Sequence, residues 1–161
     1  MRNRPVIALA GNPNVGKTCL FNALTGAHQT VGNWPGVTVE HKSGLCNYNG
    51  KSYEVVDLPG IYSLAGGSPD ELVTRNYILT EKPDIIINLV DASNLERNLY
   101  LTVQLMELGA PLIMCLSMTD IAEHNGIYID TGHLSSHLGF AVFPLVLNKR
   151  MDVSSILKKV E

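Results

Sequence analysis

Residues 11–18 constrain the fold of this chain more than any other stretch. They read G-N-P-N-V-G-K-T and fit G-x-x-x-x-G-K-[ST], the pattern of a phosphate-binding P-loop. The apolar run of residues 6–10 predicts a buried strand before the motif, and the spacing of Leu20, Phe21 and Leu24 predicts a helix after it. A chance glycine turn ending in a surface lysine is the alternative. The order of strand, loop and helix favours a phosphate site.

Each part of the motif has a physical role in binding phosphate. Gly11 and Gly16 allow a tight turn and a close approach of the backbone to an anion. The backbone N–H groups of residues 16–19 would point at the phosphates from a helix N-terminus. Lys17 would place its ammonium on the terminal phosphates, and Thr18 its hydroxyl on Mg²⁺. The predicted phosphate site consists of Gly11, Asn12, Pro13, Asn14, Val15, Gly16, Lys17, Thr18 and Cys19.

Size and charge limit the partners of the chain. Its 161 residues predict a single domain over residues 1–161. A net charge of −3, from 12 basic and 15 acidic side chains, argues against nucleic acid or an anionic membrane as the main partner. The three scattered cysteines indicate reduced thiols in a cytoplasmic protein. No stretch has the length of a membrane-spanning helix, so we expect a soluble domain without direct membrane insertion.

Strand and helix patterns alternate along the rest of the chain. Residues 27–37 lack a regular period and predict a long loop, and Asn49-Gly50 predicts a hairpin turn. Further strands are predicted at residues 39–48, 52–56, 85–90, 112–116 and 141–146, and helices at 70–80, before Gly109, and at 131–138 and 152–160. This order predicts an α/β fold: a mostly parallel six-stranded sheet with one antiparallel hairpin strand and helices on both faces. The loops at the carboxyl ends of its strands would then form the site.

Three residues beyond the P-loop are candidates for the metal and the last phosphate. Asp57 ends a strand and would hold Mg²⁺ together with the P-loop hydroxyl, although a turn aspartate before Pro-Gly is the alternative. Gly60 would turn a backbone N–H towards a γ-phosphate. Thr38 would add a second hydroxyl to Mg²⁺, but threonine is also a common strand residue.

Asp120 is the candidate for base recognition. It follows the strand at residues 112–116 in the sequence S-M-T-D. A carboxylate there accepts two hydrogen bonds from the N1–H and exocyclic amine of guanine, a donor pair that adenine lacks. A helix N-cap is the alternative reading.

The ordered motifs at 11–18, 38, 57–60 and 117–120 resemble those of Ras-like GTPases. Residues 31–40 (VGNWPGVTVE) and 90–101 (VDASNLERNLYL) further resemble the amino-terminal GTPase domain of FeoB, the bacterial ferrous-iron transport proteins. This similarity runs from about residue 6 to about residue 146 and implies a Ras-like P-loop GTPase fold.

The resemblance implies further site residues. Asn14 and the backbone carbonyls of Gly32 and Trp34 would hold a potassium ion beside the phosphates, which would stabilise charge in the transition state. Ile61 stands where Ras-like enzymes usually carry a water-orienting glutamine. The motif positions also assign nucleotide contacts to Gly36, Val37, Leu58, Pro59, Ser117, Met118, Val146, Leu147 and Asn148.

Two positions depart from the family pattern. Ser117 stands where the family usually has an asparagine, whose amide ties the base loop to the P-loop. The last base-binding loop, residues 146–150, lacks the usual glycine-rich turn. Both changes predict weak nucleotide affinity.

The functional hypothesis is a slow, potassium-stimulated GTPase that converts GTP to GDP with Mg²⁺ and serves ferrous-iron transport. Its partners would be guanine nucleotide and the membrane domain of the same full-length protein, at the cytoplasmic face of the cell membrane. Three alternatives stay open: a nucleotide switch with little turnover, a soluble biogenesis GTPase, and relaxed specificity that admits ATP. His133 and His137 have the spacing of metal ligands on a helix, but a solvated helix face explains them better.

Overall fold

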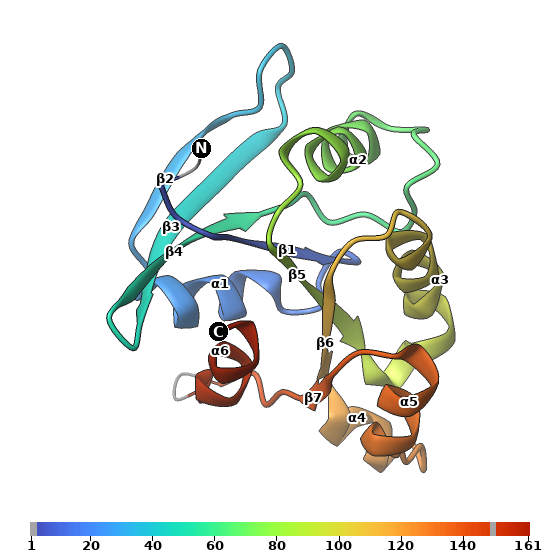
Figure 1. Ribbon diagram of the computed structural model, residues 1–161. Coiled ribbons are helices and arrows are strands. Elements are labelled where there is room, and N and C mark those ends of the chain that lie inside the picture. Colours follow the sequence, from blue (N-terminus) through green and yellow to red (C-terminus); the bar gives the residue numbers. More distant parts are fainter. Residues whose placement is uncertain (1–2, 149–150) are drawn as a thin grey trace.

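Seven strands form one sheet in the computed structural model, which describes residues 3–148 and 151–161 (Figure 1). The order across the sheet is β2-β3-β4-β1-β5-β6-β7. Strand β3 is antiparallel to both of its neighbours, and the other pairs are parallel. The strands are β1 (Val6–Gly11), β2 (Gln29–Asn33), β3 (Glu40–Tyr48), β4 (Lys51–Asp57), β5 (Ile85–Asp91), β6 (Leu112–Ser117) and β7 (Val142–Pro144).

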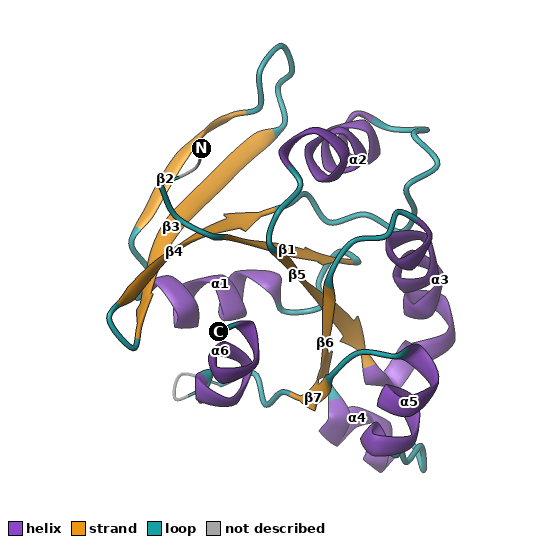
Figure 2. Ribbon diagram, viewed as in Figure 1, coloured by secondary structure: helices purple, strands orange, loops and turns teal. Residues whose placement is uncertain are grey.

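Helices cover both faces of this sheet (Figure 2). They are α1 (Lys17–Thr25), α2 (Pro69–Glu81), α3 (Leu95–Glu107), α4 (Thr119–His124), α5 (Thr131–Leu138) and α6 (Ser154–Val160), with a short 3₁₀ turn η1 (Ala92–Asn94) before α3. Within residues 3–148 and 151–161, no helix has both the length and the apolar composition needed to cross a bilayer.

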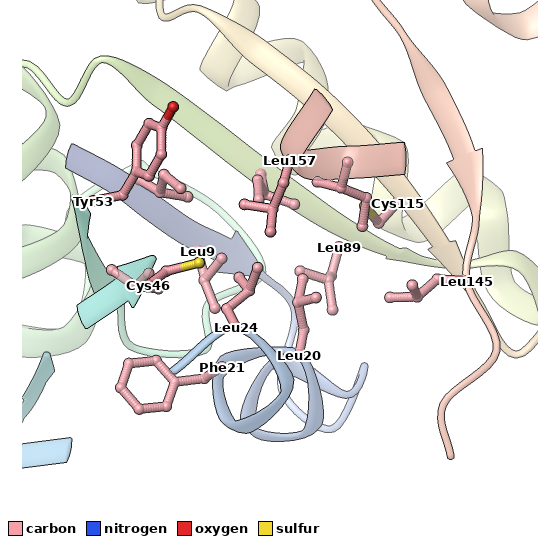
Figure 3. Packing of buried hydrophobic residues seen from close by; sticks show 14 of the residues in the cluster. Leu9, Leu20, Phe21, Leu24, Cys46, Tyr53, Leu89, Cys115, Leu145 and Leu157 are labelled. Atoms are coloured by element: carbon pink, nitrogen blue, oxygen red, sulfur yellow. The ribbon is translucent and has the colours of Figure 1, made fainter. Parts of the chain in front are cut away.

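Alternation along β1 explains why both faces are covered. Ile7 and Leu9 point into one apolar cluster, with side chains of α1 and α6. Val6, Ala8 and Ala10 point into a second cluster, formed with α2 and α3. Figure 3 shows the first cluster, where leucines of α1 lie beneath the strands. A strand buried on both faces is a continuous apolar run, as in β1, and this burial holds its carboxyl end in place.

The predicted fold class is confirmed, and the sheet has one strand more than the six predicted. The additional strand is β2, so the prediction of a loop over residues 27–37 is wrong for residues 29–33. All five residues of β2 are exposed, which leaves no apolar pattern for a sequence reading to detect. Backbone hydrogen bonds to β3 hold this edge strand, with Gly32 paired to His41.

Smaller differences lie at the carboxyl end of the chain. Strand β7 is shorter than the predicted 141–146, and α6 begins at Ser154 rather than at 152. The last two residues of the predicted base-binding loop, 149 and 150, lie outside the described residues.

Candidate functional site

The P-loop connects β1 to α1, as predicted. Gly16 caps α1 with φ 100°, and Asn14 has φ 63°, so the loop turns through left-handed conformations. Glycine adopts these without strain, and asparagine tolerates them better than most residues. No side chain caps α1 at this end. Its first N–H groups are therefore left for an anion, which is the feature that a phosphate site needs.

A cleft of about 320 Å³ opens beside this loop. It is lined by Lys17, Thr18, Val39, Glu40, Lys42, Asp57, Leu58, Pro59, Gly60 and Asp70. The Nζ atom of Lys17 lies 3.2 Å from Oδ1 of Asp57, and both side chains are about nine-tenths buried. The two residues assigned from sequence to phosphate and metal are thus direct neighbours.

These donors fit the groups that the motifs imply. The carboxylate of Asp57 and the hydroxyl of the exposed Thr18 are hard oxygen ligands, the kind that Mg²⁺ takes in proteins. Lys17 and the uncapped N–H groups of α1 fit a phosphate. Asn12 contributes a buried Oδ1 without a hydrogen-bond partner among the described residues.

The segment after Asp57 is fixed against the P-loop. The N–H of Leu58 donates to Leu9 O (3.0 Å), and that of Ile61 donates to Gly11 O (3.1 Å). A Cβ on Gly60 would lie 3.1 Å from Cα of Pro13, so a larger residue would push the two loops apart. Glycine at this position therefore keeps its backbone beside the phosphate loop.

Three charged residues of the cleft, Glu40, Lys42 and Asp70, were missed by the sequence reading. Lys42 of β3 lies opposite Asp57 of β4, and Glu40 lies two residues before it on the same face. The Nζ atom of Lys42 is 2.7 Å from Oε1 of Glu40. The hydrogen bond to Glu40 raises the pKa of Lys42 above its usual value, and the nearby charges of Glu40 and Asp57 act in the same direction.

Two of the three predicted potassium ligands, Gly32 and Trp34, lie on the β2–β3 hairpin beside α2 (Figure 1), whereas Asn14 lies in the P-loop. Trp34 is half-buried and packs edge-on against His41 and Tyr77, at centroid distances of 4.3 and 5.2 Å. Its backbone O accepts a hydrogen bond from Val37 N. The Trp34 side chain thus contacts α2, a helix of its own chain.

Thr38 is not gathered into the cleft. It is exposed on the loop, together with Gly36 and Val37, while Val39 and Glu40 line the cleft instead. Its assignment to Mg²⁺ stays a prediction that requires the loop to move.

The candidate base-binding residues follow β6. Ser117 is fully buried at the end of that strand, and its Oγ donates to Val90 O at 3.4 Å. Met118 adopts φ 55° and caps α4, and Asp120 is exposed in the first turn of that helix. Asp120 is thus accessible to a ligand, whereas the hydroxyl of Ser117 is directed to the neighbouring strand.

The last loop reaches the P-loop through Leu147. A Cβ on Gly16 would lie 2.3 Å from Cδ1 of Leu147, so the leucine sits directly on the cap of α1. Leu145 N donates to Leu116 O (2.7 Å) and ties this loop to β6, while Val146 is 67% exposed. The loops after β1, β6 and β7 therefore meet at one edge, as predicted for a parallel sheet.

Other candidates lie apart from this edge. His133 and His137 stack on α5 with ring centroids 4.3 Å apart. In the part of the chain that the structure describes, no group of three or more His, Cys, Asp or Glu is placed to hold a metal ion. The solvated helix face remains the better reading for this pair.

Comparison with known proteins gives relatives over nearly the whole chain. The family model described as "Ferrous iron transport protein B" matches residues 5–160. The Fe(2+) transporter FeoB of Methanocaldococcus jannaschii is 54% identical over 154 residues, which cover 96% of this chain and 23% of that relative. This chain therefore spans about a quarter of the length of the relative that it matches.

Solved structures agree with the fold. The FeoB G-domain from Methanococcus jannaschii superposes with a TM-score of 0.85 at 49% identity, covering 98% of this chain and 95% of that one. The cytosolic domain of T. maritima FeoB, solved in a GDP and a GMPPNP form, gives a TM-score of 0.90 in each at 42% identity. These two alignments cover 98% and 97% of this chain and 62% of the solved chain.

Proposed function

Because this chain belongs to the ferrous iron transport protein B family, we propose that it binds GTP and hydrolyses it to GDP and phosphate with Mg²⁺. The observation that carries the proposal is the cleft beside the uncapped N-terminus of α1, where Lys17, Thr18 and Asp57 come together. The GDP and GMPPNP forms of the T. maritima relative support a guanine nucleotide as the ligand.

In this proposal, the residues of the cleft position and neutralise the phosphates. The N–H groups at the start of α1 and the ammonium of Lys17 bind the phosphate oxygens, which requires Lys17 to exchange its contact with Asp57 for the nucleotide. Thr18, Thr38 and Asp57 hold Mg²⁺, which supplies positive charge on the terminal phosphates when bound. Gly60 donates its backbone N–H to the γ-phosphate, and Asp120 selects guanine.

The attacking water must be oriented without a glutamine, because Ile61 is 3% exposed and apolar. We propose that backbone groups and a potassium site at Asn14, Gly32 and Trp34 take this role, with potassium adding charge in the transition state. Trp34 packs against Tyr77 of α2 in this structure, and we propose that the hairpin moves towards Asn14 when the nucleotide binds. Turnover is therefore slow and depends on the monovalent cation.

In the full-length protein, hydrolysis would serve ferrous-iron transport. The relative from M. jannaschii is an Fe(2+) transporter of which this chain matches 23%. We propose that the remaining part includes the membrane domain, and that the present domain acts on it from the cytoplasmic face.

A nucleotide switch with little turnover is the second candidate. Two observations favour it: the buried Ser117 offers no amide to the base, and Leu147 sits on Gly16. Both would weaken nucleotide binding. The family match disfavours another of the three alternatives, a soluble biogenesis GTPase.

The experiment is a titration of GDP, GTP and ATP with phosphate release followed in K⁺ and in Na⁺ at equal ionic strength. We expect guanine nucleotides to bind, ATP to bind far more weakly, and release to be faster in K⁺. The Asn14→Ala variant should lose the difference between the two salts. Equal rates of phosphate release in K⁺ and Na⁺ would contradict the proposed potassium site. A chain that does not bind GTP would contradict the proposed function itself.

A further inference from the structure

Lys42 is a second cation at the phosphate cleft, beside the one in the P-loop. Its Cα is paired with that of Asp57 across the antiparallel β3–β4 ladder, and residues paired in this way point to the same side of the sheet. Both side chains line the cleft that holds Lys17 and Thr18. The strand register thus brings Lys42 to the site from a part of the sequence that carries no nucleotide motif.

The ion pair between Lys42 and Glu40 is weak enough for a phosphate to replace Glu40. Glu40 is bonded to it at 2.7 Å, but the carboxylate side chain is 57% exposed and the lysine side chain 30% exposed. Ion pairs exposed to this degree contribute little, because water and salt screen them. A phosphate with two negative charges inside the cleft would attract the same ammonium more strongly.

The other cation of the cleft has less freedom. Lys17 already bonds to Asp57, and both side chains are about 90% buried. A nucleoside triphosphate carries one phosphate more than a diphosphate into this cleft and needs more positive charge there. Lys42 is the neighbouring ammonium that can supply it by a change of partner.

We propose that Lys42 is a specificity-determining residue that leaves Glu40 and contacts the terminal phosphate, so that the domain distinguishes a nucleoside triphosphate from a diphosphate. The inference rests on the proposed function, since it concerns the same cleft. Glu40 holds the ammonium in place when the terminal phosphate is absent. No covalent step is involved.

The test compares dissociation constants for GDP and GMPPNP, measured with Mg²⁺ and again with EDTA, in the parent and four variants. Lys42→Gln should weaken GMPPNP binding roughly three- to tenfold and change GDP binding less than about twofold. Glu40→Gln removes the ion-pair partner of Lys42 and should tighten GMPPNP binding. Lys42→Arg keeps the positive charge and should keep most of the preference for GMPPNP over GDP. Lys51→Gln is the matched control, because Lys51 is a surface lysine of the same sheet, in β4, and its ion pair is with Glu161 and not with a residue of the cleft.

Two results would overturn the inference. One is a Lys42→Gln variant with the parental ratio of the two dissociation constants. The other is equal weakening of GDP and GMPPNP, which would indicate a general loss of charge or structure. In both cases the parent still binds GMPPNP, so the proposed function survives, whereas a parent that binds neither nucleotide contradicts the proposed function.

Discussion

At the scale of single residues, we expect Ser117 to limit the strength of the proposed base site. Its hydroxyl donates a hydrogen bond to Val90 O inside the sheet, and the residue has no exposed surface. An asparagine amide is longer and has both a donor and an acceptor to offer beyond the strand end. In the proposed site, Asp120, which is exposed on α4, would then be the main side chain for base recognition.

We expect Ser117→Asn to tighten GDP binding about two- to tenfold and to slow GDP release, because one hydrogen bond is worth roughly 0.5–1.5 kcal/mol. Stopped-flow dissociation of a fluorescent GDP analogue measures the effect. An unchanged or faster release would show that another contact already steadies this loop.

The three cysteines should differ sharply in reactivity. Burial raises the pKa of Cys115 to about 12 and also raises that of Cys46, so neither forms much thiolate near neutral pH. Cys19 is exposed beside the P-loop. A chromogenic thiol reagent at pH 8 should therefore find one fast thiol per native chain, and GDP should slow its reaction.

Cys19→Ala is the control for this assignment and should abolish the fast phase. Cys115 should stay unreactive in the native protein at pH 8, because burial raises its pKa and also keeps the reagent away from the thiol. A fast phase that survives in Cys19→Ala would contradict the burial of the other two thiols.

At the scale of elements, we expect the β2–β3 hairpin and α2 to be the parts of the proposed site that move. Trp34 of the hairpin packs against Tyr77 of α2. The loop before α2 is held separately, because the N–H of Leu64 donates to the Oε1 atom of Gln104 of α3 at 2.7 Å. Thr38 reaches a metal at Asp57 only if the loop leaves this arrangement. Segments ordered by a γ-phosphate and released without it are typical of nucleotide switches.

Trp34 is the only tryptophan of the chain, so its fluorescence reports on this hairpin. We expect GMPPNP with Mg²⁺ to shift its emission to longer wavelength, because Trp34 leaves Tyr77 for a more exposed position, while GDP changes it little. Hydrogen exchange of residues 30–38 and 60–69 should differ between the two nucleotides. Identical emission and exchange would argue against a switch.

Tyr77→Ala tests the contact itself. It should shift the emission without nucleotide, since one of the two rings against Trp34 is lost. Tyr100→Ala on α3 is the control, because Tyr100 is 59% exposed and should leave the spectrum unchanged.

The elements also show why part of the site was predictable and part was not. The P-loop, Asp57 and Asp120 follow apolar strands, and parallel strands bring such loops to one edge whatever the details of packing. Strand β2 has no buried residue, so its pairing left no pattern in the sequence. Lys42 faces the cleft because it is paired with Asp57, and that register is set by hydrogen bonds between strands rather than by any local motif.

At the scale of the whole molecule, packing on both faces of the sheet holds the strand ends that carry the loops of the proposed site. Ile7 and Leu9 on one face of β1, and Ala8 on the other, are completely buried, so the strand end that carries the P-loop is fixed from both sides. The family match extends over residues 5–160 and thus over the whole of this unit. We propose that one edge of this unit is a Mg²⁺-dependent GTPase site.

Phosphate release from GTP in Mg²⁺ and K⁺ by the parent, Lys17→Ala and Lys51→Ala tests this claim most directly. Lys17 supplies the P-loop cation, and a charged hydrogen bond of this kind is worth roughly 1.5–3 kcal/mol, so Lys17→Ala should weaken GTP binding at least about tenfold and abolish turnover. Lys51→Ala, which changes a surface ion pair with Glu161, should behave like the parent. Parental binding and turnover in Lys17→Ala would show that the nucleotide site lies elsewhere.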